Sequence, residues 1–286
     1  MDTCADEREM PSVYHYLRQN KKFPTVWCPG CGIGIVLKAI IRAVADLGLD
    51  KDKVAMVSGI GCSGRMAAYV DFNTLHTTHG RALSFATGLK LAKPEMKVIV
   101  VMGDGDAMAI GGNHFIHTAA RNMDIAAIVI NNLTYGLTRG QYSPTTPFGS
   151  VAATAPYGSI DQPFDICKTA EAAGATFVAR SVVTYVLEAE KFIARAIDKK
   201  GFSVVEIMSN CHTYFGRSNQ KATALQMMNW LKDITVPASA KAEEKAGKLE
   251  RGIFVDKELP DYLEHYKEVV RKAQEMREKE IHHDHS

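Results

Sequence analysis

The chain has 286 residues, of which 46% are hydrophobic and 23% charged, and its formal net charge is +2. This balance is ordinary for a globular enzyme, and a net charge so close to zero argues against a broad nucleic-acid-binding surface. Its acidic start lacks the pattern of a signal peptide, and no apolar run approaches the roughly 18 residues of a membrane span, so we expect a cytoplasmic protein that binds neither membrane nor nucleic acid.

The first predicted elements surround a short cysteine-containing turn. Residues 1–27 are a polar lead-in, and a C-x-x-C turn at 28–31 follows directly. Across 33–47 apolar residues recur at helical spacing, which predicts a helix. Residues 54–57 are apolar and run into the glycine-rich segment 58–64, so we expect a strand followed by a loop.

Apolar strands then alternate with helices through most of the remaining chain. The predicted strands are 97–102, 125–130, 176–179 and 203–207, and the predicted helices are 80–92, 113–122, 164–173 and 183–198. Continuous apolar strands alternating with helices indicate an α/β fold, a parallel sheet with helices on both faces. Ligands should gather beyond the carboxyl ends of its strands, where loops begin at Ser58, Gly103, Asn131 and Met208.

The composition changes beyond Pro237. Segment 241–251 is charged and poor in large apolar residues, which predicts a solvated linker or an exposed helix. Residues 260–281 have the pattern of a polar terminal helix. We therefore expect a lead-in at 1–27, an α/β domain at 28–237, and a charged extension with a terminal helix at 238–286.

A Gly-Asp-Gly turn and an Asn-Asn pair stand 25 residues apart, at 103–105 and 131–132. Each follows or ends a predicted buried strand, and residues 106–130 suffice for a loop, a helix and a strand, so both should reach the same edge of the sheet. Carboxylate and carboxamide oxygens are hard ligands that suit Mg²⁺. Glycines beside Asp104 let a diphosphate approach the backbone closely, and the next helix can point its N-terminus at it.

The sequence has six cysteines, and four of them are candidates for one shared site: Cys28, Cys31, Cys62 and Cys211. In a reducing cytosol such cysteines are weighed as metal ligands or catalytic groups rather than as disulfides. Cys62 and Cys211 each follow a predicted strand, which places both at the cofactor edge. Thiolates that converge there suit either Zn²⁺ or a 4Fe–4S cluster. A thioredoxin-like redox pair at 28–31 lacks the strand that should precede it.

The Gly-Asp-Gly and Asn-Asn motif, with this spacing, resembles the diphosphate-binding motif of thiamine-diphosphate enzymes. That resemblance implies that Asp104, Asn132 and the backbone carbonyl of Thr134 hold Mg²⁺. The residues expected to line the cofactor are Ile60, Gly61, Cys62, Ser63, His79, Gly103, Asp104, Gly105, Asp106, Asn132 and Thr134.

Several motifs in order resemble the β subunit of the 2-oxoacid:ferredoxin oxidoreductases, over roughly residues 15–235. They are Trp-Cys-Pro-Gly-Cys-Gly at 27–32, Gly-Ile-Gly-Cys-Ser at 59–63, Thr-His-Gly-Arg-Ala at 78–82 and Gly-Asp-Gly-Asp at 103–106. The resemblance implies that Cys28, Cys31, Cys62 and Cys211 hold one 4Fe–4S cluster near the thiazolium ring of the cofactor.

The resemblance also implies an activity and its partners. The expected reaction is the CoA-dependent oxidative decarboxylation of a 2-oxoacid, or its reversal, with electrons passing through the cluster to ferredoxin. The sequence contains no closely spaced C-x-x-C-x-x-C motif for a second cluster, so electrons should leave to a separate ferredoxin. A glutamate needed at the aminopyrimidine should come from an α, or fused γ/α, partner subunit with a pyrimidine-binding domain, and the chain alone should be inactive.

Segment 135–145, which follows the expected magnesium loop, resembles that of the 2-oxoglutarate-type subunits. Arg139 would pair with the second carboxylate of 2-oxoglutarate, which pyruvate lacks, or would instead anchor a loop or contact a partner. Pyruvate or broad 2-oxoacid specificity is the alternative. His79 is a second candidate for a diphosphate or substrate contact, with helix capping or a structural role as the alternative.

Two other functions fit parts of the sequence. A non-oxidative thiamine-diphosphate enzyme would use the cysteines for structural Zn²⁺, and iron content separates it from the first interpretation. A non-catalytic electron-transfer or assembly module would have no physical need for the Asp104 and Asn132 pair, so the sequence favours an enzyme.

Overall fold

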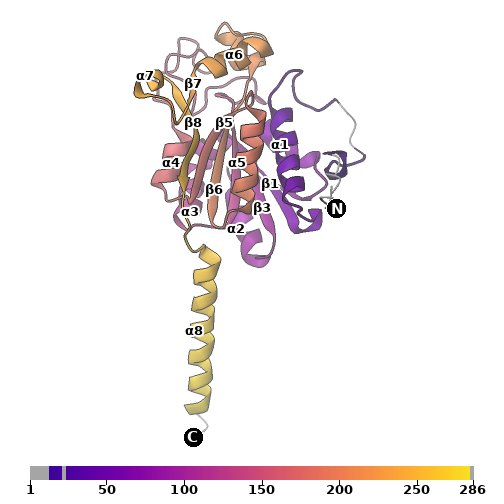
Figure 1. The fold of residues 1–286 in the computed structure, drawn as a ribbon, viewed down its shortest axis with the longest axis vertical. Helices are drawn as coiled ribbons and strands as arrows, with labels where there is room; N and C mark the ends of the chain where they lie inside the picture. The colour runs from indigo at the N-terminus through magenta and orange to yellow at the C-terminus, as the bar shows by residue number, and fades with distance from the viewer. Residues whose placement is uncertain (1–12, 21–23, 284–286) are drawn as a thin grey trace, which may run out of the picture.

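The computed structural model describes residues 13–20 and 24–283, and its centre is an eight-stranded sheet in the order β2-β1-β3-β4-β6-β5-β8-β7 (Figure 1). The expected lead-in at 1–27 therefore lies partly outside the described residues. The strands are β1 (Val54–Ser58), β2 (Asn73–His76), β3 (Lys97–Gly103), β4 (Ile125–Asn131), β5 (Phe177–Val182), β6 (Phe202–Met208), β7 (Thr235–Pro237) and β8 (Leu249–Asp256).

The first six strands in this order, β2, β1, β3, β4, β6 and β5, all pair in parallel, and β8 runs antiparallel to β5. This confirms the predicted α/β class. The register pairs Gly103 with Ile130 and Asn131 with Met208. Residues just beyond the ends of β3, β4 and β6 therefore lie side by side at one edge of the sheet, where ligands of parallel sheets bind.

Helices cover both faces of the sheet. The α-helices of the described residues are α1 (Ile33–Asp46), α2 (Ala82–Ala92), α3 (Gly112–Ala120), α4 (Ile166–Ala172), α5 (Val186–Asp198), α6 (Ala224–Asp233), α7 (Ala242–Lys245) and α8 (Tyr262–His283), and the first five of these cover the faces. One core cluster joins α1 and α5 to Ile99 and Val101 of β3, and a second joins α2, α3 and α4 to Val98 and Val100 of the same strand. Because successive strand residues point to opposite faces, a wholly apolar strand is buried on both sides.

The expectation of a solvated linker or exposed helix at 241–251 is wrong in its second half. Residues 242–245 form the short helix α7, but β8 begins at Leu249 and joins the same sheet as the rest of the domain. Polar packing stabilises this strand: Arg251 forms an ion pair with Glu188 and its guanidinium lies 3.7 Å from the centre of the Tyr185 ring. The apolar run of β8 is only three residues long, at 253–255, which is too short to reveal a strand after the charged segment.

The terminal helix predicted at 260–281 is confirmed as α8, which projects away from the body of the molecule (Figure 1). The short edge strand β2 was not predicted, because its polar, mostly exposed residues give no strand signal. Among the described residues, none of the helices combines the length and apolarity that crossing a membrane would require.

Candidate functional site

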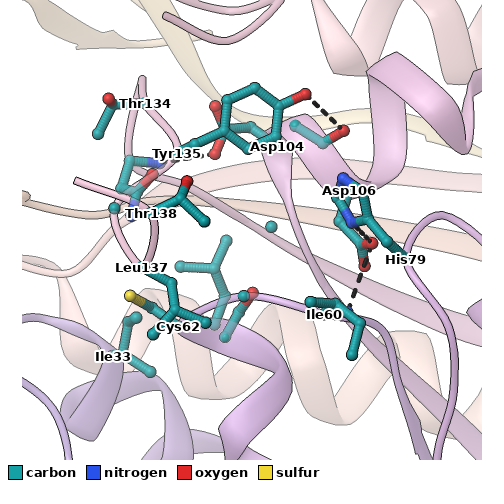
Figure 2. A pocket seen from close by; sticks show the side chains of 17 residues that line it. Ile33, Ile60, Cys62, His79, Asp104, Asp106, Thr134, Tyr135, Leu137 and Thr138 are labelled. Atoms are coloured by element: carbon teal, nitrogen blue, oxygen red, sulfur yellow. Dashed lines mark hydrogen bonds and ion pairs between the residues drawn. The ribbon is translucent and has the colours of Figure 1, made fainter. Parts of the chain in front are cut away.

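Loops after β1, β3 and β4 border a cavity of about 250 Å³ at the carboxyl edge of the sheet (Figure 2). All the residues that the sequence predicted to line a cofactor border it, from Ile60 to Thr134. Ile33, Ile130 and residues 135–138 border it as well and were not predicted. The cavity forms because β1, β3 and β4 are neighbours in the sheet, so the three loops open at one place.

Three oxygen-bearing groups converge in this cavity: Asp104, Asn132 and the backbone carbonyl of Thr134. With its nitrogen turned inward, the Asn132 carboxamide donates to Asp104 Oδ1 at 3.1 Å and to Thr134 O at 2.6 Å. Turned by half a revolution about its last bond, the same carboxamide presents its oxygen to the other two. A carboxylate, a carboxamide and a carbonyl oxygen then surround one point, which is a ligand set for a hard cation such as Mg²⁺.

Asp104 is held by two hydroxyl groups that the sequence did not reveal. Ser143 Oγ and Thr145 Oγ1 both donate to Asp104 Oδ2, at 2.5 and 2.7 Å. This leaves Oδ1 to face Asn132. Burial raises the pKa of the Asp104 carboxyl to about 6, and the hydroxyl bonds oppose that rise only in part. An ionised Asp104 is therefore costly by itself, and a cation bound beside it would compensate the buried charge.

The first asparagine of the pair, Asn131, points into a buried polar network instead of into the cavity. Its Nδ2 donates to Glu206 Oε1 at 2.7 Å, its Oδ1 accepts from the backbone N–H of Leu133, and the same Oδ1 lies 2.9 Å from Thr145 Oγ1. Glu206 in turn pairs with Arg180 at 2.7 Å. All of these polar side chains are buried. Hydrogen bonds therefore connect the cation ligands to an ion pair beneath the sheet edge.

His79 and Asp106 form a close pair on the cavity wall (Figure 2). His79 Nδ1 lies 2.6 Å from Asp106 Oδ1, which also accepts from the backbone N–H of Gly80 at 2.7 Å. The other oxygen, Oδ2, is buried without a hydrogen-bond partner among the described residues. A Cβ atom at Gly59 would lie only 1.7 Å from that oxygen, so glycine is required there. Asp106 fixes the orientation of the imidazole, and its carboxylate favours the tautomer of His79 that carries the proton on Nδ1.

A second cavity, of about 150 Å³, adjoins the first and is bordered by Cys28, Cys31, Cys62 and Cys211. Cys62 and Gly136 border both cavities. A Cβ atom at Gly136 would lie 3.4 Å from the sulfur of Cys62 and 3.6 Å from that of Cys211. The fold thus gathers four cysteines from three distant segments beside the predicted cofactor position.

The pKa values of three of these thiols are raised. Burial, with a smaller contribution from neighbouring thiols, raises the pKa of Cys31 to about 11 and that of Cys62 to about 12, and burial also raises the pKa of Cys211. Gathered thiolates would repel one another in this half-buried place. Only a positively charged centre bound between them would make their deprotonated form stable.

Arg139 lies beside the first cavity without bordering it. It follows Thr138, which does border the cavity, and its side chain is exposed. The segment is a tight hairpin in which Tyr135 and Gln141 pair, and Arg139 has a φ of 82° there. A non-glycine residue at positive φ is uncommon and marks a position worth functional attention.

Known proteins resemble this chain in sequence and in fold. Residues 59–207 match the family model described as thiamine pyrophosphate enzyme, C-terminal TPP binding domain. The chain is 45% identical to 2-oxoglutarate synthase subunit KorB of Methanocaldococcus jannaschii, over 92% of this chain and 98% of that one. It is 58% identical to the subunit of the same name from Archaeoglobus fulgidus, over 70% and 74%.

A solved structure has the same fold. It is a 2-oxoglutarate:ferredoxin oxidoreductase from Magnetococcus marinus, with 2-oxoglutarate, coenzyme A and succinyl-CoA bound. It matches with a TM-score of 0.83 and 32% identity, and the match covers 93% of each chain.

Proposed function

Because the chain belongs to the family of 2-oxoglutarate:ferredoxin oxidoreductase β subunits, we propose that it takes part in converting 2-oxoglutarate and CoA to succinyl-CoA and CO₂. In this reaction an electron pair leaves the substrate, one electron at a time, for oxidised ferredoxin. The reverse carboxylation uses the same site. The observation that carries the proposal is the juxtaposition of a hard-cation site and a cysteine-lined cavity that share Cys62 and Gly136.

The first cavity fits thiamine diphosphate and Mg²⁺. Asp104, Asn132 and Thr134 O would hold the metal, and the loop at 60–63 would lie along the cofactor. When bound, thiamine diphosphate supplies the carbanion-stabilising chemistry that decarboxylation of a 2-oxoacid requires. The protein would orient the cofactor and present the Asp104 carboxylate to the cation. It also places the His79 imidazole, fixed by Asp106, at the wall where a diphosphate or substrate group can exchange a proton with it.

The second cavity fits an iron–sulfur cluster better than a zinc ion. Four thiolates on Zn²⁺, with Zn–S bonds of about 2.3 Å, stand about 4 Å apart. No three of the sulfurs of Cys28, Cys31, Cys62 and Cys211, all of which the structure describes, lie within 4.8 Å of one another. That wider spacing suits the larger core of a 4Fe–4S cluster, which when bound would accept single electrons.

Replacing Cys28 and Cys31 together with serine should remove about four iron and four sulfide ions per copy of this chain. The measurement is iron, acid-labile sulfide and zinc in the complex purified without oxygen, with and without the substitutions. The control is Cys167→Ser, because Cys167 is buried against Glu206 and away from both cavities. Zinc in place of iron in the parent complex would contradict the oxidative reaction and leave a non-oxidative thiamine enzyme.

An α, or fused γ/α, subunit would complete the active site by covering the cofactor edge. The segment beyond the cation loop carries large apolar side chains at the surface, and Ile160 is 84% exposed. Apolar groups gathered in this way mark interaction sites. The others are Leu137, Tyr142, Phe148, Val151, Tyr157 and Phe164. The glutamate required at the aminopyrimidine would come from that partner, so this chain should be inactive alone.

Replacing Arg139 with methionine should lower the ratio of 2-oxoglutarate to pyruvate turnover by about ten-fold or more, because a charged hydrogen bond contributes roughly 1.5–3 kcal/mol. Arg139 would reach the second carboxylate of 2-oxoglutarate, and pyruvate has no such group. The measurement is kcat/KM of the assembled enzyme for both substrates. Arg139→Lys is the matched control and should keep part of the preference. An unchanged ratio in the methionine variant would assign Arg139 to loop structure or to a partner contact.

A further inference from the structure

Helix α8 presents side chains that no other part of the described structure covers. Its first turn is anchored, since Leu263 is buried and Glu264 pairs with Lys200 at 2.8 Å. Beyond this turn the helix projects from the body (Figure 1). The ion pairs that follow join Arg271 and Lys272 to glutamates of the same helix. A mainly polar helix of this length gains little stability from propensity alone.

An apolar seam runs along α8 with steps of four, three, four and three residues: Tyr262, Tyr266, Val269, Ala273 and Met276. Steps of this kind place side chains along one line of a helix and are the signature of a coiled-coil seam. Tyr266, Val269 and Met276 are 49%, 62% and 64% exposed. Tyr262 packs partly against the core, whereas no other part of the described structure covers the rest of the seam.

Basic residues border this seam on both sides. By helical spacing Lys272 and Lys279 lie along one border and Arg277 lies along the other, and all three are exposed. The glutamates Glu264, Glu275 and Glu278 lie on the opposite face. The residues that border a coiled-coil seam set partner choice by charge.

These borders disfavour pairing of α8 with a second copy of itself. In a parallel pair Lys272 would face Arg277 of the other copy, and in an antiparallel pair Lys272 and Lys279 would face the same lysines. Each arrangement places like charges side by side. An acidic border on the facing helix would satisfy both sides of the seam.

We propose that α8 docks through this seam against an amphipathic helix with acidic borders, carried by another subunit of the oxidoreductase complex. The inference rests on the proposed function only in assuming that such a complex exists. Asp256 at the end of β8 pairs with Phe177 at the start of β5. The α8 helix follows β8, so it leaves from the amino edge of the parallel strands, opposite the cofactor edge. Docking there leaves the cofactor cavities untouched.

A photoreactive side chain placed on the seam tests the docking directly. p-Benzoylphenylalanine at Val269 in the intact complex should cross-link to an acidic helical segment of another subunit. The same group at Lys267, on the outer face, is the matched control and should give no such product. A cross-link between two copies of α8, or no cross-link from Val269 in an intact complex, would overturn the proposal.

Charge reversal supplies a second measurement. Lys272→Glu combined with Lys279→Glu should weaken assembly of the complex by about ten-fold or more, whereas Lys267→Glu combined with Arg271→Glu makes the same charge change on the outer face and should alter assembly less. Equal weakening of assembly by the two double variants would argue against docking through the seam. Iron content and thiamine diphosphate binding of each variant chain should match those of the parent. If the parent complex itself contained neither iron nor thiamine diphosphate, that result would count against the proposed function and not against the docking.

Discussion

Replacing Asp104 with asparagine should lower the rate of 2-oxoglutarate oxidation by the assembled enzyme at least about 100-fold, since even an outer partner of a metal ligand costs 10- to 100-fold. The substitution keeps the shape of the side chain but removes the only negative charge from the three oxygen groups at the cation site. Mg²⁺ and diphosphate should bind correspondingly more weakly. The measurements are ferredoxin reduction rates and thiamine diphosphate binding titrated with Mg²⁺.

The same substitution should leave the fold intact, which separates a ligand from a structural residue. Burial raises the pKa of Asp104 to about 6 from its ordinary 3.8. Without a cation the folded protein therefore keeps this carboxyl protonated up to a pH of about 6, and the contribution of Asp104 to stability falls as the pH rises from 3.8 to about 6 and then stays at its lower level. Metal-free Asp104→Asn protein should unfold at the same temperature as the parent at pH 8, or higher. A large loss of thermal stability alongside the lost activity would assign Asp104 a structural role instead.

Replacing Glu206 with leucine should destabilise the protein by about 3–5 kcal/mol, the cost of removing one partner of a buried ion pair. Arg180 is only 3% exposed and would keep its charge beside one remaining carboxylate, that of Asp165. Asn131 would lose the acceptor of its Nδ2 group as well. Denaturant unfolding of the metal-free chain measures the change directly.

Arg180→Met combined with Glu206→Leu supplies the control. Removing both charges takes the Arg180 partner from Asp165 as well, but that carboxylate is partly exposed and keeps Lys168 at 3.9 Å, so the double variant should recover much of the lost stability. It should still bind thiamine diphosphate and Mg²⁺ more weakly than the parent, because Asn131 remains without its acceptor and the loop that carries Asn132 is no longer held. Full cofactor affinity in the double variant would show that the network stabilises the fold without positioning the site.

Patterns within single strands were sufficient to predict the core of the sheet. The segments 97–102 and 125–130 are continuously apolar because β3 and β4 are buried on both faces. The motif spacing predicted which loops meet, since parallel strands deliver their carboxyl ends to one edge. β8 escaped prediction because its apolar run is only three residues long, at 253–255, and its first half is polar and stabilised by contacts such as Arg251 with Glu188.

The sequence by itself determined the α/β class, the residues from Ile60 to Thr134 that border the cavity, and the cysteines that border its neighbour, because these features reside in short motifs at strand ends. Only the tertiary structure decided how they are supported. Ser143 and Thr145 reach Asp104 from a loop without a motif, and Glu206 holds Asn131 from another strand. Hydrogen bonds between residues far apart in the chain depend on packing and register, which no local pattern records.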